Sequence, residues 1–162
     1  MRGFVIWLVV QFALLYPAQS PLGKPVPKFS DYAVAEIYTG KNAAPKITHD
    51  WHLFRTRIRE GASEPPNFAG NYRIVHWGCG SDCLTGALVD LKTGDVYSLP
   101  FESLWLDVFA TEGWRGKGLL YEKDSRLLIV DGCPTEKCGT YYYEWTGTTF
   151  QLLQSGRHSV EK

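Results

Sequence analysis

The hydrophobic pattern of the chain changes its period near residue 70. Before that point, four apolar side chains recur at spacings of four, three and four residues, which places them on one face of a helix: Ile47, Trp51, Phe54 and Ile58. Thr48 is positioned to cap this helix, and Gly61 followed by two prolines ends it. The pattern therefore predicts one amphipathic helix over residues 49–60.

From Asn71 onward, apolar and polar residues alternate with a period of two, which is typical of strands. The predicted strands cover residues 71–78, 84–91, 95–99, 118–122, 126–132, 140–145 and 149–153. The stretch 101–117 is less regular. We expect its aromatic residues, among them Trp105, Phe109 and Trp114, to plug one side of the sheet.

Two segments of the strand-rich region resemble each other. Residues 72–99 and 126–153 each contain an apolar strand, a Gly-Cys pair, a short polar loop, a second cysteine, another strand, a glycine turn and a third strand. Self-similarity of this kind marks repeated supersecondary units. The sequence thus predicts an α+β fold, mainly an antiparallel β meander of two blade-like hairpin units, with one N-terminal amphipathic helix against one face.

The N-terminus has the features of a signal peptide. Arg2 precedes a twelve-residue apolar run over residues 4–15, and the small residues Ala18 and Ser20 stand where a signal peptidase requires them. Twelve residues are too few for a membrane span, which needs about 20. We therefore expect a signal peptide over residues 1–20, a proline-rich extended tether over 21–29, and a single domain over 30–162. Residues 30–40 fit a helix or a strand equally well. These features predict a periplasmic or secreted protein with no stable membrane span after cleavage.

Four cysteines allow three pairings. In an oxidising compartment we favour Cys79 with Cys83 and Cys133 with Cys138, so that each disulfide closes one hairpin loop. The cross-pairing between the two hairpins remains open. Reactive thiols are the alternative, but His76 is the only base nearby, and its odd separation from Cys79 puts the two side chains on opposite faces of a strand.

Composition excludes several classes of function. The chain has 17 basic and 17 acidic residues, so it has no electrostatic footprint for nucleic acid. It lacks a glycine-rich phosphate loop, a zinc-finger spacing and an HExxH motif, and we expect neither a cofactor nor a metal. His49 and His52 are three residues apart, a spacing at which two histidines on a helix can bind a metal, but a solvated helix start explains them better.

Polar loop residues and aromatic residues supply the candidate binding surface. The two cysteine-closed loops would present Ser81, Asp82, Glu136 and Lys137 to a partner. In the run after them, Tyr141, Tyr143 and Trp145 share one strand face and Tyr142 takes the other. Tyr142 either forms part of an exposed aromatic patch or lies on a covered face.

Three motifs carry a resemblance to a known group: FRTRIRE (54–60), NFAGNY (67–72) and WGCGSDC (77–83). In this pattern the chain resembles small exported bacterial proteins without an established activity, which implies export and fold. The segment YYYEWTGTTFQLL (141–153) is similar to blade-like periplasmic proteins that inhibit lysozymes or confer immunity to wall-degrading effectors.

These observations lead to one functional hypothesis and two alternatives. We expect an exported non-enzymatic envelope protein that binds another macromolecule, a protein or a cell-wall component, as an inhibitor or immunity factor does. The alternatives are an envelope thiol enzyme that uses Cys79 or Cys83 and a structural envelope component.

Overall fold

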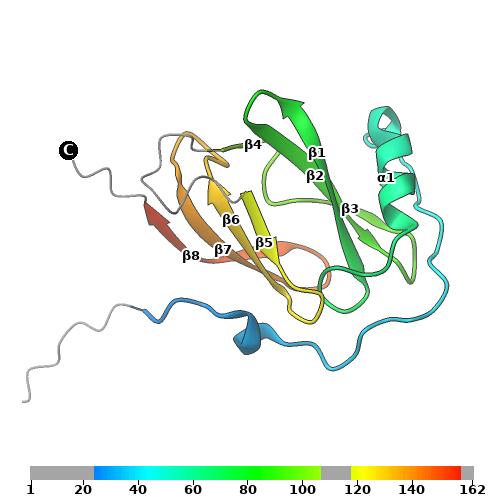
Figure 1. Cartoon of the computed structure of the whole chain (residues 1–162), viewed down its shortest axis with the longest axis horizontal. Helices are drawn as coiled ribbons and strands as arrows, with labels where there is room; N and C mark the ends of the chain where they lie inside the picture. The colour runs from blue at the N-terminus through cyan, green and yellow to red at the C-terminus, as the bar shows by residue number, and fades with distance from the viewer. Residues whose placement is uncertain (1–23, 107–117, 158–162) are drawn as a thin grey trace, which may run out of the picture.

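The computed structural model describes residues 24–106 and 118–157, and Figure 1 shows their arrangement. Two short 3-10 helices, η1 (Phe29–Tyr32) and η2 (His52–Phe54), precede the helix α1 (Arg55–Ala62). The strands are β1 (Tyr72–Gly80), β2 (Cys83–Asp90), β3 (Val96–Ser98), β4 (Leu104–Trp105), β5 (Gly118–Tyr121), β6 (Leu127–Gly132), β7 (Gly139–Trp145) and β8 (Phe150–Arg157). The predicted α+β class, with mostly antiparallel strands and one short α-helix, is confirmed.

The strands form two antiparallel sheets that pack face to face. The first sheet has the order β1-β2-β3, with β4 paired to the first two residues of β2. The second sheet has the order β5-β6-β7-β8. A core between the sheets contains fully buried side chains from both, among them Leu88, Leu104, Leu128, Val130 and Trp145. The helix covers the opposite face of the first sheet, where Ile58 and Ala62 pack on Val75, Ala87 and Val89. The layers are therefore helix, sheet, sheet.

The two similar sequence segments correspond to equivalent parts of the two sheets. β1, β2 and β3 form one three-stranded meander, and β6, β7 and β8 form the other. In each meander, the hairpin between the first two strands carries a cysteine pair. Each sheet then gains a fourth strand from outside its repeat, β4 in the first and β5 in the second.

The helix begins later than the sequence predicts. The α-helix covers residues 55–62. Residues 49–54 form turns instead, in which the amides of Trp51, His52 and Phe54 each donate to the carbonyl three residues earlier. Thr48 is not the cap, because Phe54 holds the N-cap position. The apolar spacing still has its predicted effect, since Ile47, Trp51 and Phe54 all pack against the buried cluster that contains Ile58. Tight turns and a helix present the same face here, which is why the pattern placed the helix start too early.

The prediction that Trp105 plugs one side of the sheet is wrong. Its side chain is 53% exposed and does not plug a face of the sheet. The adjacent residue Leu104 fills that place instead, with no exposed surface. Phe109 and Trp114 lie outside the described residues, as does the predicted signal peptide over residues 1–20. The described part of the predicted tether is residues 24–29, of which 24–28 contain neither helix nor strand and Phe29 begins η1.

A long strap, residues 33–46, joins the two sheets at the end where β1 and β6 begin (Figure 1). Its amides donate to turn carbonyls of both sheets: Val34 to Asp124 (2.8 Å), Tyr38 to Gly70 (2.9 Å), Ala43 to Leu91 (2.9 Å) and Lys46 to Gly94 (2.8 Å). Gly70 and Gly94 both have a φ of +81°, and a β-carbon on either would collide with a strap carbonyl, that of Glu36 or Ala44. Glycine is thus required where the strap crosses a turn. The ambiguous segment 30–40 forms η1 and the start of this strap, joined to Ser125 by one bridge at Ala33.

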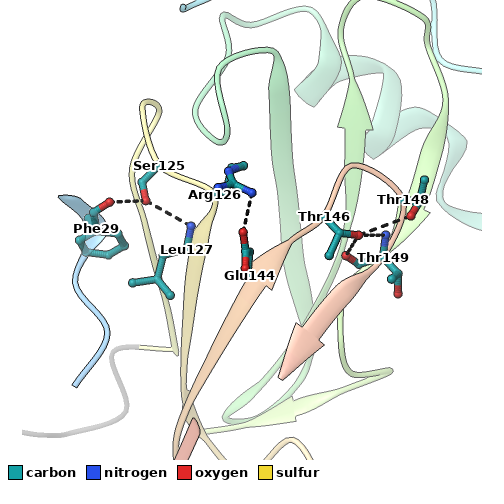
Figure 2. A network of polar contacts seen from close by, with 8 residues as sticks. All are labelled: Phe29, Ser125, Arg126, Leu127, Glu144, Thr146, Thr148 and Thr149. Atoms are coloured by element: carbon teal, nitrogen blue, oxygen red, sulfur yellow. Dashed lines mark hydrogen bonds and ion pairs between the residues drawn. The ribbon is translucent and has the colours of Figure 1, made fainter. Parts of the chain in front are cut away.

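Polar side chains reinforce the same end of the second sheet, as Figure 2 shows. The Ser125 hydroxyl donates to the Phe29 carbonyl at 2.8 Å and accepts the Leu127 amide at 3.2 Å. Arg126 forms an ion pair with Glu144 across β6 and β7. These contacts fix the end of the sandwich opposite the cysteine hairpins.

Asn67 blunts the open edge of β1, and its replacement gives a test of this fold. Its side-chain amide donates to the Ile74 carbonyl (3.0 Å) and its oxygen accepts the Ile74 amide (2.8 Å), as a neighbouring strand would. We expect Asn67→Ala to lower the free energy of unfolding by about 1–3 kcal/mol, because it leaves two backbone groups unpaired. Urea unfolding measures this, with the exposed Ser30→Ala as control. A change below about 0.5 kcal/mol, which is usual for surface substitutions, would contradict the role given to Asn67.

No helix within residues 24–106 and 118–157 is long and apolar enough to cross a membrane.

Candidate functional site

Each of the two sequence repeats carries its own disulfide. Cys79 is bonded to Cys83, with their Cα atoms 5.1 Å apart, and Cys133 to Cys138, with their Cα atoms 4.0 Å apart. The favoured pairing is therefore confirmed, the cross-pairing is wrong, and no cysteine is free. Disulfides persist outside the reducing cytoplasm, so both bonds favour an oxidising compartment.

The short strand β4 brings the two disulfide hairpins together. On one side Trp105 pairs with Cys83, and the Leu106 amide donates to the Asp82 carbonyl at 2.8 Å. On the other side the Cys133 amide donates to the Trp105 carbonyl at 2.7 Å, and the Trp105 amide donates back to Cys133 at 3.3 Å. β4 thus bridges the two sheets, and both hairpins lie at the same end of the molecule (Figure 1).

Gly132 makes this bridge sterically feasible. It has a φ of +152°, and a β-carbon there would meet the Trp105 carbonyl oxygen at 2.6 Å. β4 can approach β6 closely only because position 132 has no side chain. The Gly-Cys pair of the second repeat therefore has a structural use that its sequence did not reveal.

The side chain of Trp105 lies between the two disulfides. Residues paired directly across antiparallel strands point to the same face, with β-carbons about 4.5–5.5 Å apart. Cys83 and Cys133 are such partners of Trp105, one on each side. Leu104 points the opposite way, into the core between the sheets, and anchors β4. Trp105 is consequently an exposed indole on a well-anchored strand, flanked by two covalent cross-links.

The four predicted loop residues lie on either side of this tryptophan. Ser81, Asp82, Glu136 and Lys137 are all exposed. Their backbones are held: Asp82 adopts a φ of +54° and accepts from Leu106, while the Lys137 carbonyl accepts the Tyr141 hydroxyl at 2.6 Å. We call this surface the cystine platform, defined as the two disulfides together with Ser81, Asp82, Trp105, Glu136 and Lys137.

Tyr142 lies elsewhere. It is on the outer face of the second sheet, paired with Ile129 and Gln154, and is half-buried. Burial, and then the nearby Asp131, raise the pKa of the Tyr142 phenol above its usual value. Tyr141 and Tyr143 stack on the inner face with ring centroids 6.5 Å apart, and Trp145 is buried beside them, so the predicted division of faces is confirmed.

Thiol and metal chemistry find little support in the described residues. Both cysteines of the WGCGSDC motif are bonded to each other. Burial lowers the pKa of the His76 imidazole, which makes it a weaker base than an exposed histidine. Within the described parts of the chain, no three histidine, cysteine, aspartate or glutamate side chains gather closely enough to hold a metal ion.

The sequence located the loops but missed the residue between them. Trp105 falls in an irregular stretch with no strand period, and the apolar Leu104 beside it is the one local sign of a short strand. Comparisons with protein-family models, with curated proteins and with solved structures found no match to this chain.

Proposed function

We propose that this protein is an exported, non-enzymatic envelope protein that binds another macromolecule through the cystine platform, as an inhibitor or immunity factor does. The observation that carries the proposal is the position of Trp105. It is the large exposed aromatic residue at the point where β4 joins two disulfide-closed hairpins.

Rigid presentation of exposed side chains is what a binding surface needs. A partner that docks on a preorganised loop does not have to order that loop first, so less free energy is lost on association. Tryptophan is enriched among the residues that dominate binding energy at protein interfaces. The exposed polar side chains around Trp105 resemble the polar rim of such an interface.

Export to the periplasm or beyond is part of the same proposal. It is supported by the signal-like residues 1–20 and by two disulfides, which are rare in cytosolic proteins. The disulfides also weigh against the alternative of an envelope thiol enzyme, because a thiolate nucleophile requires a reduced cysteine.

Intact mass after alkylation tests both points. We expect the exported protein to lack the mass of residues 1–20 and to gain no alkyl group under native conditions. After reduction in denaturant it should gain four, one for each cysteine. Alkylation of one or two thiols under native conditions would contradict the structural role of the disulfides and would favour thiol chemistry at Cys79 or Cys83.

Binding itself is tested by capture. Immobilised protein is incubated with an envelope extract of the exporting cell and with purified cell-wall sacculi, beside a variant in which Ser81, Asp82, Glu136 and Lys137 are all alanine. A second variant, Lys24→Ala with Lys28→Ala, changes exposed charges outside the platform and serves as control. Retention lost only in the platform variant supports the proposal. Equal retention by all three proteins, or none by any, would favour a structural component.

A further inference from the structure

A surface groove lies on the helix side of the first sheet, beside the cystine platform. It has a volume of about 570 Å³ and runs between residues 50–54, ahead of α1, and residues 98–102, between β3 and β4. This volume lies within the range of about 300–1,000 Å³ that is usual for ligand sites. α1 begins only at Arg55, so the wall at residues 50–54 comes from the turns that precede the helix and not from the helix itself.

The lining of the groove combines aromatic and proline surface with negative charge. Trp51 and Phe54 form one wall, and Pro100 and Phe101 contribute to the other. Two exposed carboxylates, those of Asp50 and Glu102, complete opposite sides of the lining. Among the residues that the structure describes, no lysine, arginine or histidine lines the groove. The nearby Arg55 guanidinium is engaged with the His52 carbonyl at 3.0 Å.

The groove and the platform belong to one continuous face. Thr85 lines the groove and lies two residues after Cys83 on β2, so both side chains point to the same side of the strand. The Thr85 hydroxyl donates to the Glu102 carbonyl at 2.7 Å, which fixes the wall of the groove to the sheet. Trp105 lies three residues after Glu102 in the chain and pairs with Cys83, so it is on that same face. A ligand that lies along the groove would therefore reach Trp105.

We infer that this groove takes an extended, positively charged segment of a protein partner. The inference rests on the proposed function and deepens it by naming the chemistry of the partner. Arginine and lysine side chains are attracted both to the faces of tryptophan and phenylalanine and to carboxylates. Extended proline-containing segments dock in aromatic grooves of this kind because they lose little conformational entropy on binding. Two acids in a described lining that holds no basic side chain give the charge complementarity that orients such a segment.

The probe is a capped peptide that alternates arginine and proline, titrated by calorimetry into the intact exported protein. Matched probes are the same peptide with glutamate in place of arginine and a β-linked N-acetylglucosamine oligomer. The test variant is Asp50→Asn with Glu102→Gln, which keeps side-chain size and removes both charges. The control variant is Glu122→Gln with Asp124→Asn, which neutralises two exposed acids in the turn between β5 and β6.

We expect saturable binding of the arginine peptide that weakens with added salt, no binding of the glutamate peptide, and a dissociation constant at least ten times larger for the test variant. The control variant should bind like the unmodified protein. Equal binding by the test variant, equal binding of both peptides, or salt-independent binding of the sugar oligomer alone would each overturn the inference.

The test variant, its control and the platform variant are all carried through the envelope capture assay, so that the two proposals can fail separately. If the platform variant loses retention while the arginine peptide binds independently of Asp50 and Glu102, the groove inference is wrong and the proposed function stands. If the platform variant keeps full retention, the proposed function is wrong, and the groove inference falls with it.

Discussion

Replacing Trp145 with alanine should lower the free energy of unfolding by about 3–5 kcal/mol, the range usual for truncating a buried tryptophan or phenylalanine. Trp145 is 1% exposed and lies at the centre of the core between the sheets. Its ring contacts Tyr72 and Tyr97 of the first sheet at centroid distances of 5.3 and 5.1 Å, and Phe150 of the second at 4.9 Å. Alanine would therefore leave a cavity where the two sheets meet.

Urea unfolding followed by far-ultraviolet circular dichroism measures this loss. Since a domain of this kind is stable by only about 5–15 kcal/mol, the alanine variant could unfold outright, and Trp145→Phe is the second variant. Phenylalanine keeps the ring contacts and should lose less than alanine does. Leu53→Ala, at a side chain 84% exposed, is the control and should change stability little. A Trp145→Ala loss as small as that of the control would show that the sheets do not depend on this contact.

The sequence predicted the elements whose hydrophobic pattern is local. Each long strand alternates or is continuously apolar over several residues, so strands near 71–78, 84–91 and 126–132 were recognisable to within a few residues. β4 was missed because two residues are too short for any period to show. The helix start was misplaced because 3-10 turns at 49–54 present nearly the same apolar face as a helix.

The candidate site depended more on long-range pairing. The cysteine spacings indicated two closed loops, and both disulfides form as expected. Nothing local shows that β4 lies between these loops, because the contact joins Trp105 to residues 22 and 28 positions away in the chain. In hindsight, Gly132 before Cys133 was a signal, since glycine inside a strand often marks the close approach of another backbone. The groove was equally hidden, because its walls come from separate segments.

Trp105 differs from the other exposed apolar side chains in how firmly it is held. An isolated exposed hydrophobic residue is ordinary on a protein surface and needs no explanation. Trp105 pairs with a disulfide-bonded cysteine on each side, Cys83 and Cys133. The fully buried Leu104 beside it anchors β4 in the core. Its backbone cannot shift without breaking contacts in both sheets, so burial of the indole under a partner adds affinity without the entropy of ordering a loop.

Trp105→Ala should consequently abolish most binding while leaving the fold intact. Hot-spot residues contribute about 2 kcal/mol or more, so we expect the affinity for captured envelope material to fall by roughly thirty-fold or more. The free energy of unfolding should change by less than about 1 kcal/mol, because the side chain is 53% exposed and makes its strand contacts through the backbone. The capture assay, titrated with soluble protein as competitor, measures affinity, and urea unfolding measures stability. Leu152→Ala, at a side chain 51% exposed on β8, is the matched control for the loss of exposed apolar surface. If the two variants compete equally well, Trp105 is not the centre of the binding surface, whereas a loss confined to Trp105→Ala would place the partner across both disulfide hairpins.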